Sequence, residues 1–299
     1  MNSWGFLTSP GSSAAFRSIC RPLGAFPRAV CILALLTALP TAVWSRDREG
    51  PPVPATLPPP KHSVPPVGER LAFQGRWMGI PVGHGWIEVK ELTEINGRPA
   101  YHIEVQGHTN EVLSKIYPIH DVVHSYVDAE TLKPLKFEKH QREGHYKSDE
   151  EVTFDHAARK AHYRSLLNKS EKDIDLPEDF QDLISALYWF RAQPLQPDQP
   201  VSVKLYTDEK IYDTRIDVKS PAILELLKRG TFRSIVAEPN ASFKGLLIKR
   251  GRIWAYLTAD ANRIPLLVRA TTPWGAMSAV IDEHSLEAAL GTKPTQHVQ

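Results

Sequence analysis

Residues 85–106 read GWIEVKELTEINGRPAYHIEVQ, and this stretch decides the fold class. Apolar and polar residues alternate on both sides of Asn96 and Gly97, as when Tyr101, Ile103 and Val105 are separated by polar residues. A period of two is typical of a strand with one buried face. Asn-Gly favours a two-residue hairpin turn because both residues readily adopt positive φ. The stretch therefore predicts two antiparallel strands joined by a tight turn.

The same alternation recurs along the chain from residue 68 onward, interrupted by turn residues. About a dozen sequential strands exceed what a twisted open sheet usually holds without curling. The sequence therefore predicts a mainly β fold, a curved antiparallel sheet of half-barrel or barrel-like form, with two short packed helices. The strands are expected at 69–78, 85–92, 100–106, 119–127, 134–142, 146–154, 160–167, 201–207, 211–219, 231–237, 243–249, 252–258, 264–271 and 276–282.

Two segments break the alternation and predict the helices. Segment 177–193 lies between two prolines and carries apolar residues at helical spacing, namely Phe180, Leu183, Ile184, Leu187 and Phe190. Segment 221–229 follows Ser220 as a possible N-cap, has Pro221 in its first turn and is followed by Gly230. Both are too apolar for a free surface, so we expect them to lie against the concave side of the sheet.

The first 45 residues have the pattern of a secretory signal. Arginines precede a run of fifteen uncharged residues at 29–43, and Ser45 offers a cleavage site. The run is short for a membrane span, so 1–45 is expected to be a signal peptide or an uncleaved N-terminal anchor. Either form places the remainder in the periplasm, close to a membrane. Both cysteines, Cys20 and Cys31, lie in this leader, which leaves no thiol for a disulfide or a thiolate metal site beyond it.

Composition divides the rest of the chain. Residues 46–67 are expected to be a Pro-rich linker, because eight prolines fall in 50–66 and favour an extended, solvated spacer. Residues 68–285 are expected to be the antiparallel β domain, and 286–299 a disordered tail. The full-length net charge is only +2, which argues against binding to nucleic acid.

Signatures of catalysis are missing from the sequence. It has no Gly-x-Ser-x-Gly elbow, phosphate-binding glycine loop or His-Glu-x-x-His motif. We therefore predict no catalytic residue, metal ligand or cofactor. A non-enzymatic protein is favoured, although a carboxylate pair brought together only by folding stays open.

Histidine is the one anomaly of composition, since nine of twelve lie between His84 and His162. His120 and His124 project from the same face of one predicted strand, together with Tyr126. Imidazoles four residues apart on a strand are separated by about 13 Å and cannot share one ion without help from neighbouring strands. Three interpretations of these histidines stay open: a solvated polar face, a metal site and a pH-responsive patch.

The candidate pocket combines two apolar groups of residues. Segment 109–118 is expected to be a short helical or irregular connection, capped by Thr109 or Asn110. Its apolar side chains would fold over one end of the sheet, where the first predicted helix would meet them. The expected pocket-lining residues are Leu113, Ile116, Tyr117, Leu183, Leu187 and Phe190. Ordinary core packing is the alternative for each.

Four blocks of the sequence carry a resemblance to a known family. They are GERLAFQGRWMGIPVGHGWIEV at 68–89, TNEVLSKIYPIHDVVHSYVDAETLKPLKFEKHQREGHYKSDEEVTFD at 109–155, DLISALYWFRAQPL at 182–195 and GRIWAYLTADANRIPLLVRATTPWGAMSAVI at 251–281. Over nearly all of 68–282 the chain resembles the bacterial domain of unknown function 3108. The resemblance implies an exported envelope protein with a curved sheet. By analogy its shape is similar to the lipoprotein-localisation carriers, which hold acyl chains.

Three functions stay open at this stage. The preferred hypothesis is a periplasmic, non-enzymatic protein that binds a lipid, an acyl chain or a lipidated partner such as a lipoprotein inside the half-barrel. The second is a glycan-binding or glycan-acting protein with an aromatic platform drawn from Trp77, Trp86, Trp254 and Trp274. The third is a scaffold that pairs a free strand edge with a partner. The oligomeric state and the ligand are not specified by the sequence.

Overall fold

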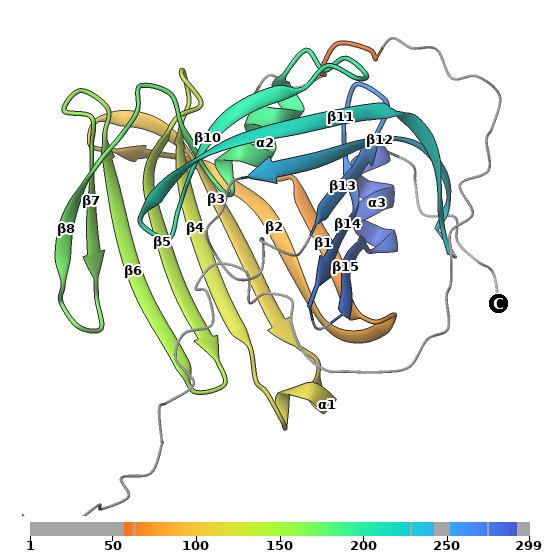
Figure 1. The fold of residues 1–299 in the computed structure, drawn as a ribbon, viewed down its shortest axis with the longest axis horizontal. Helices are drawn as coiled ribbons and strands as arrows, with labels where there is room; N and C mark the ends of the chain where they lie inside the picture. Colours follow the sequence, from red (N-terminus) through yellow and green to blue (C-terminus); the bar gives the residue numbers. More distant parts are fainter. Residues whose placement is uncertain (1–56, 62–63, 228, 242–251, 274, 292–299) are drawn as a thin grey trace, which may run out of the picture.

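The computed structural model describes residues 57–61, 64–227, 229–241, 252–273 and 275–291. Within them the chain forms fifteen strands and three helices (Figure 1). The strands are β1 (Arg70–Trp77), β2 (Ile80–Ile95), β3 (Arg98–Thr109), β4 (His120–Asp128), β5 (Pro134–Glu143), β6 (Tyr146–Asp155), β7 (Lys160–Ser165), β8 (Glu171–Asp175), β9 (Gln181–Asp182), β10 (Val201–Thr207), β11 (Lys210–Leu226), β12 (Gly230–Ala241), β13 (Ile253–Thr258), β14 (Pro265–Thr272) and β15 (Gly275–Ile281). The helices are α1 (Glu111–Ser114), α2 (Ser185–Ala192) and α3 (Glu283–Leu290).

All fifteen strands belong to one sheet, in the order β8-β7-β6-β5-β4-β3-β2-β1-β15-β14-β13-β12-β11-β10-β9. Neighbouring strands are antiparallel except β9 and β10, which run parallel. The first strand pairs with the last, with Phe73 opposite Ile281. The predicted hairpin at Asn96 and Gly97 is confirmed, and both residues have positive φ. The predicted fold class, a mainly β curved sheet, is also confirmed.

The sheet curls until its two ends face each other. The hairpin of β10 and β11 reaches the concave face of β6 and β7 (Figure 1). There the ring of Tyr206 lies 5.1 Å from that of Phe154, centroid to centroid, and Lys172 pairs with Glu209. The edge strands β8 and β9 do not hydrogen-bond to each other in the described sheet. Side-chain packing therefore closes the curve in place of a backbone ladder.

Helix α2 lies inside this curve, and its beginning is fixed by a buried carboxylate. Asp182 is fully buried, and its Oδ2 accepts a hydrogen bond of 2.6 Å from Ser125 Oγ on β4. Its Oδ1 accepts bonds of 2.8 Å from the backbone N–H groups of Ile184 and Ser185. Burial raises the pKa of Asp182, although these hydrogen bonds oppose the rise. The carboxylate thus ties the first turn of the helix to the sheet.

The other end of α2 is held by two arginines. Arg263 is 1% exposed, and its guanidinium donates to the carbonyl oxygens of Arg191, at 2.7 Å, and of Gln193. Arg191 in turn donates two hydrogen bonds, of 2.6 and 2.8 Å, to the carboxylate of Glu69. The contacts of Arg263 satisfy carbonyl groups that a helix leaves unpaired at its C-terminus. The guanidinium of Arg263 makes no ion pair with Asp260 in the described structure; only the backbone N–H of Arg263 donates to Asp260 Oδ1, at 3.1 Å.

The first predicted helix is shorter than expected. It was predicted over 177–193, but α2 begins at Ser185. Gln181 and Asp182 instead pair with Leu205 and Tyr206 as strand β9. The apolar spacing included Phe180, which is buried but lies before the helix begins. The spacing therefore predicted a helix that starts too early.

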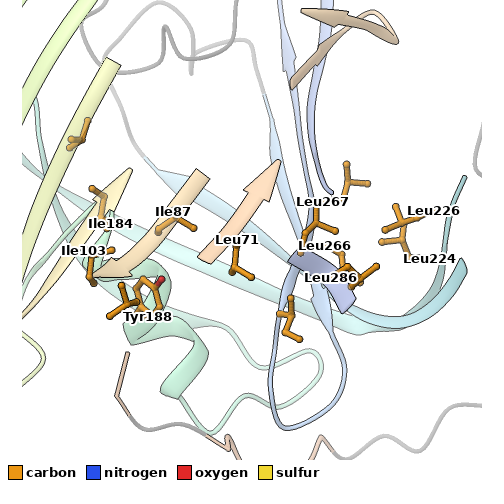
Figure 2. Packing of buried hydrophobic residues seen from close by; sticks show 14 of the residues in the cluster. Leu71, Ile87, Ile103, Ile184, Tyr188, Leu224, Leu226, Leu266, Leu267 and Leu286 are labelled. Carbon is orange, nitrogen blue, oxygen red and sulfur yellow. The ribbon is translucent and has the colours of Figure 1, made fainter. Parts of the chain in front are cut away.

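The second predicted helix, at 221–229, is wrong. β11 continues to Leu226 and pairs with β12. Pro221 falls at a register shift between Lys219 and Ala222, a place where a strand tolerates proline. Leu224 and Leu226 are buried in the same cluster as Leu286 of α3, and Figure 2 shows these side chains together. The segment AILELL at 222–227 has apolar residues spaced as in either a helix or a strand. Its contacts with β12 and with α3 stabilise the strand.

The C-terminal boundary also differs from the prediction. Residues 286–290 were assigned to a disordered tail, but they form most of α3. Asp282 caps this helix by accepting a 2.8 Å hydrogen bond from the N–H of Ser285, and Gly291 ends it with a φ of 69°. Leu286 is 3% exposed. The second packed helix of the fold is therefore α3.

The linker is not solvated throughout. Leu57 packs against the apolar cluster that contains Val203 and Leu257, and the N–H of Lys61 donates to the carbonyl of Ala261 at 2.7 Å. The predicted leader at 1–45, the predicted strand at 243–249, Trp274 and residues 292–299 lie outside the described residues. None of the described helices is long and apolar enough to cross a membrane.

Replacing Arg263 with methionine is expected to lower the free energy of unfolding by roughly 2–4 kcal/mol, because buried carbonyl oxygens lose a charged donor. Urea denaturation measures the change. Arg215→Met is the control, since that arginine is 63% exposed and pairs with Asp217 at the surface, where an ion pair contributes under about 1 kcal/mol. Equal losses in the two variants would contradict the role given to Arg263.

Candidate functional site

The concave side of the sheet contains a cavity of about 350 Å³, here called the large cavity. It lies between the sheet and the side chains that precede and begin α2. Its walls come from β1 to β3, from β13 to β15 and from the connection around α1. The apolar side chains in these walls are Phe73, Val82, Ile87, Val105, Leu113, Tyr117, Ile119, Leu183, Ile184, Leu187, Ala255, Leu257, Pro265, Val268 and Ala279.

The floor of the large cavity is nearly free of side chains. Gly75 lies opposite Gly83, and Gly85 lies opposite Gly107, across adjacent strands. Ala279 extends the same row onto β15, opposite Gly75. These small residues line the cavity together. The hollow therefore exists because the floor residues carry no side chain or only a methyl group.

Two of these glycines cannot be replaced without moving the backbone. A Cβ atom on Gly83 would lie 2.2 Å from the carbonyl oxygen of His108, and one on Gly85 would lie 2.4 Å from that of Gln106. Gly75 differs, because the nearest atom to its Cβ position is 3.5 Å away, an ordinary contact. A side chain at Gly75 would therefore enter the cavity with little strain.

Four of the six predicted pocket residues line the large cavity: Leu113, Tyr117, Leu183 and Leu187. The N–H of Tyr117 donates to the carbonyl of Leu113, so the two side chains lie on one face of the turn. Asn110 caps α1 by accepting from the N–H of Leu113 at 2.9 Å.

The other two predicted residues do not line either cavity described here. Ile116 is 72% exposed because it lies on the opposite face of the α1 turn from Leu113 and Tyr117. Phe190 is 5% exposed and packs in the cluster with Val203 and Leu205. For Phe190 the core-packing alternative holds.

A second cavity of about 130 Å³, here called the small cavity, adjoins the first. Val105, Leu183 and Ile184 line both cavities, so these three side chains form a shared wall. The far side of the small cavity is polar. Its polar and charged lining residues are Lys139, Gln141, Glu150, Tyr206, Thr207, Asp208 and Glu209. Sequence reasoning missed them, because they meet only when β10 curls over β5 and β6.

The polar side of the small cavity holds one tight ion pair and buried polar atoms that lack a hydrogen-bond partner in the described structure. Lys139 Nζ lies 2.9 Å from Glu150 Oε2, and both side chains are about nine-tenths buried. The hydroxyl of Tyr206 and Oε1 of Gln141 are buried and find no hydrogen-bond partner in the part of the chain that the structure describes. Burial raises the pKa of Tyr206 far above its usual range, so the phenol is neutral.

Histidines of β2 and β3 alternate with the glycines of the floor, and His84 and His108 also border the large cavity. Strand alternation directs Gly83, Gly85 and Gly107 inward and their neighbours His84 and His108 outward. Nε2 atoms of His84 and His108 are 2.6 Å apart. The rings of His108 and His120 stack with their centroids 6.3 Å apart.

A second group of histidines lies further along the same strands. His102 Nε2 lies 3.0 Å from His124 Nδ1, and Tyr126 stacks on His102 with centroids 4.7 Å apart. Sequence reasoning placed His120, His124 and Tyr126 on one face but missed their cross-strand partners. Across the described residues, no three His, Cys, Asp or Glu side chains converge as a metal site would require.

Two of the histidines have shifted pKa values. Burial lowers the pKa of His108, and the neighbouring imidazoles of His84 and His120 lower it further. Burial also lowers the pKa of His124. The other groups facing His124 are His102 and His140, which lower its pKa, and Glu104 and Glu138, which raise it.

The tryptophans do not form one platform in the described structure. Trp77 is 8% exposed. Trp86 on β2 is covered by the guanidinium of Arg70, 4.4 Å from the ring centroid. Trp254 on β13 faces Arg252 in the same way at 4.9 Å, and β1, β15 and β14 separate it from Trp86.

The model of the family described as “Protein of unknown function (DUF3108)” matches residues 72–282. No curated protein matches the sequence. Among solved structures, the chain is similar to a β-barrel-like protein of domain of unknown function DUF1849 from Brucella abortus, with 10% identity and a TM-score of 0.49. That similarity covers 72% of this chain and 95% of the other. At this level it carries no argument about function.

Gly83→Ala is expected to lower the free energy of unfolding by about 2–3 kcal/mol, because the new Cβ atom forces β3 away from β2. Gly75→Ala is the matched control on the neighbouring strand and is expected to change stability by less than about 1 kcal/mol. Thermal or urea unfolding measures both. A similar loss in the two variants would show that close backbone approach is not what excludes a side chain at Gly83.

The lowered pKa values of His108 and His124 predict a loss of stability in mild acid. The folded state takes up protons on these rings less readily than the unfolded chain, whose histidines titrate near about 6.5. The stability that they contribute is therefore present above that pH and is lost as the pH falls from 7.5 to 5.5. Replacing both histidines with glutamine should reduce the fall in Tm over this interval. His145→Gln, at an exposed turn, should leave the fall unchanged; an equal fall in all three proteins would contradict the assignment.

Proposed function

We propose that this chain, which belongs to the DUF3108 family, is an exported envelope protein that binds an acyl chain of a lipid or lipidated partner in its large cavity. The observation that carries the proposal is an apolar hollow of about 350 Å³ above a floor of glycine and alanine. Pockets for small ligands range from about 300 to 1,000 Å³. The cavity is therefore large enough for part of an elongated apolar molecule.

The driving force for such binding is the removal of apolar surface from water. Each buried methylene contributes roughly 0.8 kcal/mol, and an apolar cavity is a poor site for water. Leu183 and Leu187 form one wall of this cavity, while Phe73 and Ile87 belong to the sheet. These side chains offer contacts to a hydrocarbon chain without requiring any hydrogen bond from it.

Exposed apolar side chains near the large cavity support an encounter with a lipid surface. Val112 and Ile116, one turn apart at α1, are 74% and 72% exposed, and Ile80 at the start of β2 is 59% exposed. The adjacent Asn110 bonds to the backbone of Pro81 and Val82, which brings the two segments together. The secretory pattern of residues 1–45 supports a periplasmic location, where lipids and lipoproteins are the proposed partners.

Filling the large cavity tests the proposal. Ala279→Leu on β15 projects into the cavity, and we expect it to weaken the binding of the apolar dye N-phenylnaphthylamine at least about ten-fold, equivalent to about 1.4 kcal/mol. Ser278→Leu is the matched control, because the neighbouring side chain points to the opposite face of the same strand. Fluorescence titration measures both affinities.

Native mass spectrometry and lipid extraction of protein purified from its own envelope provide the second test. A bound acyl lipid that is lost in Ala279→Leu and kept in Ser278→Leu is the expected result. Protein that carries no lipid and takes up no dye would overturn the proposal.

A further inference from the structure

The small cavity offers a polar end to the apolar site, and this combination identifies the class of ligand. We infer that the protein binds a single-chain amphiphile whose head group is uncharged and carries hydroxyl groups, as in a monoacylglycerol. The inference rests on the proposed function, since it places the chain in the large cavity and the head group in the small one.

The two cavities are close enough to hold one molecule. They share Val105, Leu183 and Ile184 as a wall. Leu183 is 44% exposed, so it is less confined by packing than the buried Ile184 beside it. Binding of one molecule across both requires that a change of the Leu183 rotamer joins the two cavities. A chain in the large cavity can then present its head to the polar side chains.

The unsatisfied polar atoms specify hydrogen bonding in both directions. Gln141 Oε1 is an acceptor without a donor, and the hydroxyl of Tyr206 both donates and accepts. Both residues are 4% exposed, and leaving such atoms unpaired is costly. A hydroxyl group of a ligand can donate to Gln141 and accept from Tyr206. An ammonium group could donate to Gln141 and to the oxygen of Tyr206, but it has no lone pair to accept the hydroxyl proton of Tyr206.

The charges around the small cavity disfavour an anionic head group. Lys139 is already paired with Glu150 at 2.9 Å, and Ser148 donates a further bond to Glu150. Asp208 and Glu209 add negative charge at the β10–β11 turn, where Lys172 pairs with Glu209. A carboxylate or phosphate would enter beside these acidic groups with no unpaired cation in the cavity lining to receive it. Fatty acids and lysophospholipids are therefore expected to bind less well.

The volume of the small cavity fits a small head group. A cavity of about 150 Å³ takes benzene, which has six heavy atoms. The small cavity measures about 130 Å³, and a glycerol head also has six heavy atoms. A disaccharide head is too large for it.

The test compares three ligands with the same twelve-carbon chain, namely 1-monolauroylglycerol, laurate and dodecylamine, each displacing N-phenylnaphthylamine from the full exported protein. We expect the monoacylglycerol to bind at least about ten-fold more tightly than laurate, and more tightly than dodecylamine, which the acidic side chains attract but which leaves the Tyr206 hydroxyl proton unpaired. Tyr206→Phe should weaken monolauroylglycerol roughly three- to ten-fold, the value of one neutral hydrogen bond. The same variant should leave the affinity for the dye unchanged.

Tyr188→Phe is the matched control. The hydroxyl of Tyr188 is also buried without a hydrogen-bond partner in the described structure, but Tyr188 lines neither cavity. We expect it to leave the affinities for all three ligands unchanged. Neither variant should lose stability, because among the described residues neither hydroxyl has a hydrogen-bond partner to lose. This separates a role in binding from a role in folding.

The outcomes distinguish the inference from the function on which it rests. Equal affinities for the three ligands, tighter binding of laurate or dodecylamine, or an unchanged affinity in Tyr206→Phe would each overturn the head-group inference while chain binding stands. Failure of the dye and of all three ligands to bind would overturn the proposed function itself.

Discussion

Helix α2 is attached to the sheet by buried polar contacts at its two ends, and the cavities depend on this attachment. Asp182 fixes its start to Ser125 of β4, and Arg263 holds its last carbonyl groups. Ile184 and Tyr188 pack in one cluster with Ile87 and Ile103 of the sheet, while the directional polar bonds fix where along the sheet the helix lies. The glycines beneath α2 cannot fill the remaining space, so an interior volume is left.

The two faces of the central strands are coupled by the alternation of side chains. Positions 83, 85 and 107 supply the glycine floor, and positions 84 and 108 supply the convex histidines. A one-residue slip of β2 against β3 would exchange the two sets. The register that creates the apolar hollow therefore also creates the contact between the imidazoles of His84 and His108.

The sequence was informative where local pattern determines structure. Alternation predicted the curved antiparallel sheet, and Asn96 with Gly97 predicted a hairpin that is present. It failed at 221–229, where the choice of strand over helix depends on distant α3. It also missed the polar end of the site, because Tyr206 and Gln141 are brought together by the curl of the sheet. The contact of Ser125 with Asp182 has no local signal for the same reason.

The pairing of β1 with β15 has a consequence for the order of assembly. The centre of the sheet is a contact between the two ends of the domain, so it cannot form until the last strand has been delivered. Such non-local pairing is intrinsically slow, since chain closure must come before the contact stabilises anything. Until then β1 and β14 expose bare edges, which template aggregation. A protein built in this way benefits from a chaperone that shields these edges until β15 pairs with β1.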